Sequence, residues 1–490
     1  MEQASQPTGS GLRRNAIGLP GAVIMSAAIM GPAVSTFFNP QFSTPSSGFA
    51  TPLVYVLCLV AMLITATGVI EMARALPSAG AFYTYVTRGF GPRAGFVTGG
   101  LIFAAYALLP PAEIGLIGGY LQSTFNDEGI GNIPWWAIGL VPAIVMTVLA
   151  FEGIVSSLRT ALILFSAEVF IVVLMALIVV VNGGHEGLNL HPFNPSSSPQ
   201  GFGGLLTGGI FAALSFVGFE AAASLGEEVK EPRRRIPRAI LYSTLLVGGI
   251  YAFCIWAESM GLGRDGMNSL EATGTPWNDL AAQYASWMKW PVIVASVSSM
   301  FAVMLASNNG IVRILNKMGR EGLLPSLFGY VDPKRRTPIF AVLFQGVFAV
   351  GLAFLVGTLA GGLGGASAGI NVYFYLGFLL TMGILPVYVL TNAAAIRFFR
   401  ERGDFQPVRH LVLPGLGALL MVGLTIGQIV EQVEAPFTWF PWVIVGWVLA
   451  VSIGAAWLGA RRPESLRAAG AAMGSVDDPE EEKDLALGVA

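Results

Sequence analysis

Long apolar runs alternate with short polar segments along almost the whole chain. Each run of about 20 apolar residues is long enough to cross a hydrocarbon core about 30 Å thick as an α-helix. The pattern predicts an all-α integral membrane protein with twelve transmembrane helices. They are expected near residues 16–39, 51–76, 96–123, 133–151, 158–182, 202–226, 238–262, 289–316, 337–361, 369–398, 410–432 and 437–460.

The basic residues predict an orientation, because Lys and Arg accumulate in cytoplasmic loops. Placing the N-terminus inside puts 25 of the 27 Lys and Arg residues on the cytoplasmic side, and only Arg264 and Lys289 fall outside. A miscounted span would scramble this segregation in every later loop. The distribution therefore supports twelve spans and two cytoplasmic ends. The polar tails, 1–15 and the acidic 461–490, are expected to be disordered.

Composition agrees with a membrane protein and argues against several other classes. Charged residues make up 11% of the chain, against about 25% in soluble domains. A net charge of −2 offers no basic surface for nucleic acid. Cys58 and Cys254 lie in apolar runs and no histidine lies well inside one, so no disulfide, metal site or nucleophile–base pair is predicted. We expect a protein that is not an enzyme and needs no cofactor.

Two spans are interrupted near their middle. In the first, Gly31 precedes Pro32, which has no N–H to donate. In the sixth, Gly218 and the carboxylate of Glu220 interrupt an apolar run. Since the two spans run in opposite directions, matched breaks predict two five-helix repeats of inverted topology with the substrate between the breaks. Simple kinks are the alternative, because Pro and Gly are frequent in membrane helices.

Several loop motifs then indicate a family. They are PSAGAFYTY at 77–85, RGFGPRAGF at 88–96, SFVGFEAAASLGEEVKEPRRRIPRA at 215–239 and RILNKMGREGLLPSLFGYVDPKRRTP at 313–338. In this order they resemble the loops of amino-acid permeases of the amino acid, polyamine and organocation transporter superfamily. The resemblance covers roughly residues 16–460 and implies the LeuT-type fold. Its five-helix repeats would be 16–182 and 202–398, with two extra helices at 410–460.

The resemblance places a substrate between the broken segments. The expected substrate-binding residues are Ser26, Ala27, Ala28, Gly31, Glu113, Phe211, Leu214, Ser215, Phe216 and Gly218. Two positions depart from the family pattern. Where many permeases have Gly-Ser-Gly or Gly-Ala-Gly, this chain has Gly31, Pro32 and Ala33, which leaves fewer N–H donors for a substrate carboxylate. Leu214 stands where a bulky aromatic is frequent, so Phe211 or Phe216 is expected to cover the site.

Carboxylates within the spans are candidates for binding, because a charge is costly there. Glu113 in span three is expected to pair with a substrate ammonium or carry a proton, or else to bond a carbonyl freed by the neighbouring prolines. Glu220 stands where related transporters have an acidic residue implicated in proton sensing, or it anchors the broken helix. Glu168 stands where some relatives have a lysine in place of a bound sodium. Ser298 and Ser299 are candidate sodium ligands, with close helix packing as the alternative.

Other carboxylates fall near the ends of spans. Glu71 is expected to form an interfacial ion pair with Arg74, and Glu152 and Glu258 are also expected to be interfacial.

The leading functional hypothesis is a secondary active transporter that moves amino acids across a bacterial plasma membrane by alternating access. Its expected partners are a small amine-bearing solute, a coupling proton or sodium ion, and the lipid bilayer, with the proton favoured. No nucleotide-binding motif is present, so an ion gradient or exchange must supply the energy. The alternatives are a polyamine or other amine substrate, a sodium-coupled or exchange mode, and a ligand sensor that does not transport.

Overall fold

The computed structural model describes residues 17–461 except 79, 153, 227, 271–274, 321, 323, 334, 336 and 431–435. The predicted polar tails, 1–15 and 461–490, lie outside the described residues except for Arg461, which ends the last helix. The described part is helical, and Ile17 and Val229 form an isolated β-bridge.

The first half of the chain forms nine α-helices and their connections. They are α1 (Leu19–Met30), α2 (Pro32–Phe37), α3 (Pro40–Ser47), α4 (Thr51–Ala75), α5 (Phe82–Phe90), α6 (Pro92–Ala107), α7 (Leu109–Asp127), α8 (Trp135–Phe151) and α9 (Ile154–Val181). Short 3-10 turns follow α3 and α9: η1 (Gly48–Ala50), η2 (His191–Phe193) and η3 (Pro195–Ser197).

The second half follows the same plan of long apolar helices and short connections. Its helices are α10 (Gly201–Phe216), α11 (Pro232–Asn268), α12 (Pro276–Tyr284), α13 (Lys289–Arg320), α14 (Ser326–Gly329), α15 (Ile339–Leu359), α16 (Ala366–Arg402), α17 (Leu413–Val430) and α18 (Phe440–Arg461). The shorter turns are η4 (Ala221–Leu225), η6 (Ser286–Met288), the π-turn η7 (Val408–Val412) and η8 (Phe437–Trp439).

Eleven helical segments in the described residues are long and apolar enough to cross a membrane. They coincide with eleven of the twelve predicted spans. The remaining predicted span, 133–151, is α8, an apolar helix of 17 residues. An all-helical architecture with many apolar helices is thus confirmed, whereas the count of twelve stays a prediction.

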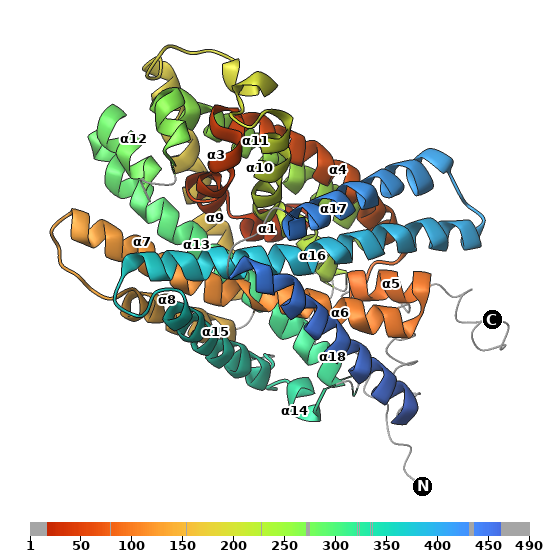
Figure 1. Cartoon of the computed structure of the whole chain (residues 1–490). Coiled ribbons are helices and arrows are strands. Elements are labelled where there is room, and N and C mark those ends of the chain that lie inside the picture. Colours follow the sequence, from red (N-terminus) through yellow and green to blue (C-terminus); the bar gives the residue numbers. More distant parts are fainter. Residues whose placement is uncertain are drawn as a thin grey trace, which may run out of the picture.

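The long helices pack into one bundle in which elements distant in sequence are neighbours (Figure 1). Helix α16 lies across the middle and packs against α7, α17 and α4. Helix α11 packs along α4, and the short α1 is enclosed by α11, α13 and α9. The interrupted first helix therefore lies inside the bundle. Its residues from Ser26 to Met30 in α1 and from Pro32 to Phe37 in α2 are buried.

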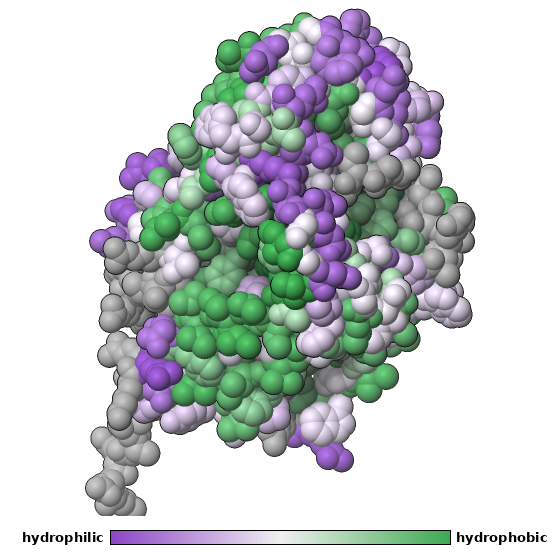
Figure 2. All heavy atoms as spheres, turned by 90° about the vertical axis from the view of Figure 1, so that its left-hand side faces the viewer, coloured by the Kyte–Doolittle hydropathy of each residue, from purple (hydrophilic) through white to green (hydrophobic). Residues whose placement is uncertain are grey.

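Connecting segments gather at the end of the bundle where α12 lies. The residues after α9 lie there, and the indole of Trp256 in α11 donates a hydrogen bond to the carbonyl of Asn189 at 2.9 Å. Figure 2 views this end, with hydrophilic residues over its upper and central part and mostly apolar residues below. This mixed face contrasts with the apolar helix flanks that a bilayer requires.

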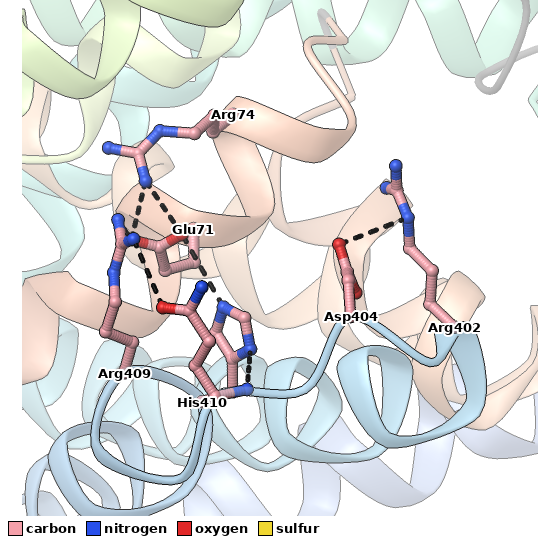
Figure 3. Close-up of polar contacts among 7 residues, drawn as sticks. Glu71, Arg74, Arg402, Asp404, Arg409 and His410 are labelled. Carbon is pink, nitrogen blue, oxygen red and sulfur yellow. Dashed lines mark hydrogen bonds and ion pairs between the residues drawn. The ribbon is translucent and has the colours of Figure 1, made fainter.

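A cluster of charged side chains joins the opposite end of α4 to the π-turn η7, which precedes α17 (Figure 3). Glu71 accepts hydrogen bonds from Arg74 and from Arg409, each at 2.8 Å. His410 lies 3.7 Å from the same carboxylate and stacks on Phe399 with ring centroids 3.9 Å apart. The predicted pair of Glu71 and Arg74 is therefore present, and it belongs to a larger junction of α4, α16 and α17.

Candidate functional site

The first break lies at Gly31, between α1 and α2. Its φ of 53° is in the left-handed region that favours glycine. A Cβ atom here would lie 2.5 Å from Val34 Cγ1 and 2.6 Å from Val303 Cγ2. The carbonyl of Met30, freed by the break, accepts hydrogen bonds from the hydroxyl of Ser35 at 2.7 Å and from that of Tyr251. Protein side chains thus satisfy the broken backbone, as membrane depth requires.

The second break follows α10. Val217 is extended and Gly218 has a φ of 109° before η4 begins. The carboxylate of Glu220 accepts a hydrogen bond from the Gly218 N–H at 3.2 Å and another from the Tyr106 hydroxyl of α6 at 2.7 Å. Glu220 therefore holds the broken segment and ties it to α6. This contact matches the anchoring role that was one of its two predicted interpretations.

The two breaks touch each other. A Cβ atom on Gly218 would lie 2.4 Å from Ile29 Cγ2, and the hydroxyl of Ser26 accepts a hydrogen bond from the Ala222 N–H at 2.9 Å. The Tyr251 hydroxyl of α11 bonds the carbonyls of both broken helices, Met30 and Ser215. One small region therefore contains the ends of all four half-helices.

Polar side chains form a network on one side of this region. Ser215 Oγ accepts a hydrogen bond from Asn39 Nδ2 at 2.8 Å and lies 3.2 Å from the hydroxyl of Tyr55. The Tyr373 hydroxyl donates to Asn39 Oδ1 at 2.8 Å. All four side chains are buried. Of the four, only Ser215 was predicted as a binding residue, and Tyr373 was considered for the pathway but assigned to packing. The position of Asn39 could have indicated the rest of the network, because a buried amide at the end of an apolar run needs hydrogen-bond partners.

Two predicted carboxylates, Glu113 and Glu168, lie in the bundle without an ion-pair partner among the described residues. Glu113 of α7 is 1% exposed and Glu168 of α9 is fully buried. Glu113 Oε2 and both oxygens of Glu168 have no hydrogen-bond partner among the described residues. The two carboxyl groups are close enough to interact electrostatically, and Glu168 also lies near Ser299. Carboxylates without a compensating partner are costly to bury.

The two candidate serines of α13 differ. Ser299 is fully buried and its hydroxyl accepts a hydrogen bond from the Val34 N–H at 3.1 Å, which places it at the first break. Ser298 is partly exposed and donates to the Ala295 carbonyl of its own helix at 3.1 Å. Consecutive residues point about 100° apart around an α-helix, so the structure brings Ser299 to the break and leaves Ser298 away from it.

The aromatic candidates occupy different surroundings. Phe216 is fully buried and packs edge-on against Tyr251 at 5.3 Å. Phe211 packs against Phe374 and Phe378 of α16 at 5.9 and 5.8 Å. Phe216 is therefore the aromatic ring beside the breaks, whereas Phe211 belongs to a separate aromatic group.

The remaining candidates are small or aliphatic. Ala27 and Ala28 are buried in the last turns of α1. Leu214 lies against α16, where a Cβ atom on Gly377 would come within 2.9 Å of its Cδ2. These residues shape the surroundings of the breaks and supply no polar side-chain group.

The structure corrects the expectation for Glu258. It lies toward the C-terminal end of α11, and it is fully buried and not at a surface. Trp277 of α12 lies next to its carboxyl group. Glu152 is exposed, and its interfacial position stays a prediction. The extra burial comes from α12, a helix that lies outside the predicted spans.

Comparison with known proteins now supplies a family. A family model described as amino acid permease matches residues 17–453. The chain is 26% identical to the low-affinity putrescine importer PlaP of Escherichia coli K12, over 76% of this chain and 80% of the importer. It is 25% identical to the branched-chain amino acid permease BcaP of Bacillus subtilis, over 86% and 89% of the two chains. It is 27% identical to cationic amino acid transporter 7, chloroplastic, of Arabidopsis thaliana, over 72% of this chain and 60% of that protein. Because the family model spans most of the sequence, the chain belongs to the amino acid permease family and is a permease, not an enzyme.

Proposed function

We propose that this permease is a proton-coupled secondary transporter that carries a cationic amine, either a basic amino acid or a polyamine, by alternating access. Its fold would be the LeuT type, with twelve spans, two inverted five-helix repeats and a site between the two breaks. Both chain ends would lie in the cytoplasm of a bacterial cell.

The paired breaks support the position of the site. Interrupted helices in corresponding places of two halves are the usual pointer to a transporter's binding site. Here the breaks at Gly31 and Gly218 lie in contact and share Tyr251 as a hydrogen-bond donor. A movement of either half-helix would change the surroundings of the other, which is what alternating access needs.

The single observation on which the proposal of a cationic substrate depends is the pair of buried carboxylates, Glu113 and Glu168. Neither forms an ion pair with a described Lys, Arg or His residue. An ammonium group would supply the missing partner for one carboxylate, and a coupling proton would neutralise the other. Pro32 also removes one backbone donor that a substrate carboxylate would use. The names of the putrescine importer and the cationic amino acid transporter agree with this choice.

Uptake into proteoliposomes tests the proposal. We expect radiolabelled putrescine or lysine to enter, and to enter faster when the outside is more acidic. Glu113→Gln should lower uptake roughly 10- to 100-fold, because a hydrogen bond to a charged group contributes about 1.5–3 kcal/mol. Glu168→Gln should abolish the response to a pH gradient. Glu401→Gln, at an exposed pair with Arg397, is the matched control and should transport normally.

Two results would contradict the proposal. If leucine were the only solute taken up, and at equal rates by the wild type and Glu113→Gln, the substrate would not be a cationic amine. If the rate of uptake and the final accumulation in the wild type did not depend on pH, transport would not be coupled to protons. Replacing external choline by sodium would then show whether sodium is the coupling ion.

A further inference from the structure

Glu258 is the buried carboxylate that the proposed site does not use. It lies in α11 seven residues after Tyr251, so the two side chains share a helix face about 10 Å apart. Five residues further along, Gly263 has a φ of 70° and kinks α11 before the helix ends at Asn268. The group therefore lies between the two breaks and the end of the bundle where α12 and the α9–α10 connection lie.

The surroundings of Glu258 contain no described cation. Both of its oxygens are buried and lack hydrogen-bond partners, and so does the indole Nε1 of Trp277 beside it. The titratable neighbours are Tyr55 of α4 and Cys254 of its own helix. Further along α11, a Cβ atom on Gly263 would lie 3.1 Å from His185 Nδ1 and 3.4 Å from Glu186 Oε1, and the charged residues Arg264 and Asp265 follow Gly263 in the chain.

Helix α12 closes the space above this carboxyl group. The ring of Trp277 packs on Phe37 of α2 with centroids 4.5 Å apart. The hydroxyl of Tyr120 in α7 donates to Asn278 Oδ1 at 2.9 Å, and the hydroxyl of Tyr284 donates to the Gly261 carbonyl at 3.0 Å. Helix α12 therefore contacts α2, α7 and α11 at once, and its displacement would expose Glu258 to external water.

Hydroxyl groups connect Glu258 with the breaks. Tyr55 lies near Glu258, and its hydroxyl is 3.2 Å from Ser215 Oγ at the second break. Tyr251, which donates to the Ser215 carbonyl at 2.8 Å, lies near Glu168 in turn. Hydroxyls can both accept and donate a proton. Tyr55 near Glu258 and Tyr251 near Glu168 are therefore the groups that become proton carriers when the carboxylates move into hydrogen-bond distance.

We propose that Glu258 is the external proton acceptor of the transport cycle. With α12 displaced, its carboxylate takes a proton from external water. As the outer side closes, that proton moves inward to Glu168, which releases it to the cytoplasmic side after the substrate has left. The hydroxyl of Tyr55 lies near the first carboxylate and that of Tyr251 near the second. The inference rests on the proton coupling put forward under Proposed function and adds the residue at which the external proton binds.

The test separates proton coupling from substrate movement in proteoliposomes at zero membrane potential. A gradient of one pH unit corresponds to about 1.4 kcal/mol per proton. With one proton per substrate, the wild type should therefore accumulate putrescine or lysine up to about tenfold. Glu258→Gln, which imitates a permanently protonated carboxyl, should only equilibrate the substrate, with no accumulation. It should still exchange internal for external substrate, since exchange needs no net proton release.

Control variants make the outcome decisive. Glu186→Gln changes an exposed carboxylate at the same end and should accumulate substrate as the wild type does. Glu258→Leu, which fills the buried position with an apolar side chain, should also exchange substrate without accumulating it. It replaces Glu258→Gln as the deciding variant if the latter does not fold. Tenfold accumulation by whichever of the two variants folds would overturn the assignment. If the wild type did not accumulate substrate in response to the pH gradient, the proton coupling put forward under Proposed function would be wrong.

Discussion

At the scale of single residues, Gly31 has the most constrained backbone position of the first break. Alanine there would adopt a left-handed conformation, which costs roughly 1–2 kcal/mol, and would place its Cβ within 2.6 Å of Val34 and Val303 side chains. We therefore expect Gly31→Ala to lower the melting temperature of the purified protein and to reduce transport at least tenfold. Fluorescence-monitored thermal unfolding and proteoliposome uptake measure the two effects.

Gly351→Ala is the control for this substitution. Gly351 lies within α15, and a Cβ atom there would meet nothing within 4 Å. Alanine is the better helix former by about 1 kcal/mol, so this variant should be as stable as the wild type or more so. Equal melting temperatures for the two variants would show that the break at Gly31 tolerates a side chain.

Residue patterns predicted the breaks but only part of their surroundings. Gly31, Gly218 and Glu220 were predictable because glycine, proline and carboxylates are conspicuous in apolar runs. Tyr251 was not, since one tyrosine in a membrane helix is equally typical of packing, and only the fold shows that it faces two freed carbonyls. The choice between Ser298 and Ser299 likewise depends on the rotation of α13, which sequence leaves open.

At the scale of elements, an ion pair holds α13 to the segment after η4. Arg313 Nη2 lies 2.9 Å from the Glu228 carboxylate, and their side chains are 16% and 4% exposed. The same segment bonds the chain before α1, because the Ile17 N–H donates to the Glu228 carbonyl at 3.1 Å and the Lys230 N–H to the Ile17 carbonyl at 3.0 Å. Three elements thus meet at Glu228.

We expect Glu228→Ala to destabilise the protein by about 3 kcal/mol, because it leaves a mostly buried arginine without its partner. Glu401→Ala removes an exposed pair with Arg397, whose side chains are 59% and 56% exposed, and should cost less than about 1 kcal/mol. Thermal unfolding of both variants checks the difference. Similar losses for the two would mean that water reaches Arg313 and compensates for the missing carboxylate.

Elements with a membrane-length apolar run were predicted, and those without one were not. The predicted spans coincide with long helices to within a few residues, because hydrophobic length is set by the bilayer. Helices α3 and α12 lie outside the runs, in segments with Ser, Thr, Pro and Asn. Their positions follow from packing on α10 and α13, which explains why the burial of Glu258 beneath α12 was missed.

At the scale of the whole molecule, the predicted orientation depends on whether α8 crosses the membrane. Its 17 residues span about 25 Å, slightly less than a hydrocarbon core of about 30 Å. If α8 failed to cross, every later loop would change sides and the segregation of Lys and Arg would be lost. The positive charges therefore favour a crossing, with local thinning of the bilayer or polar ends reaching the interface.

Cysteine labelling at the two ends of α8 tests this prediction. Ile130, which is 56% exposed before α8, should react as a cysteine with a membrane-impermeant maleimide added to intact cells. Glu152, exposed after α8, should react as a cysteine only after the membrane is permeabilised. The native Cys58 and Cys254 are buried, so background labelling should be low. Labelling of both positions from the same side would mean that α8 does not cross, and the twelve-span arrangement with its inverted repeats would fail with it.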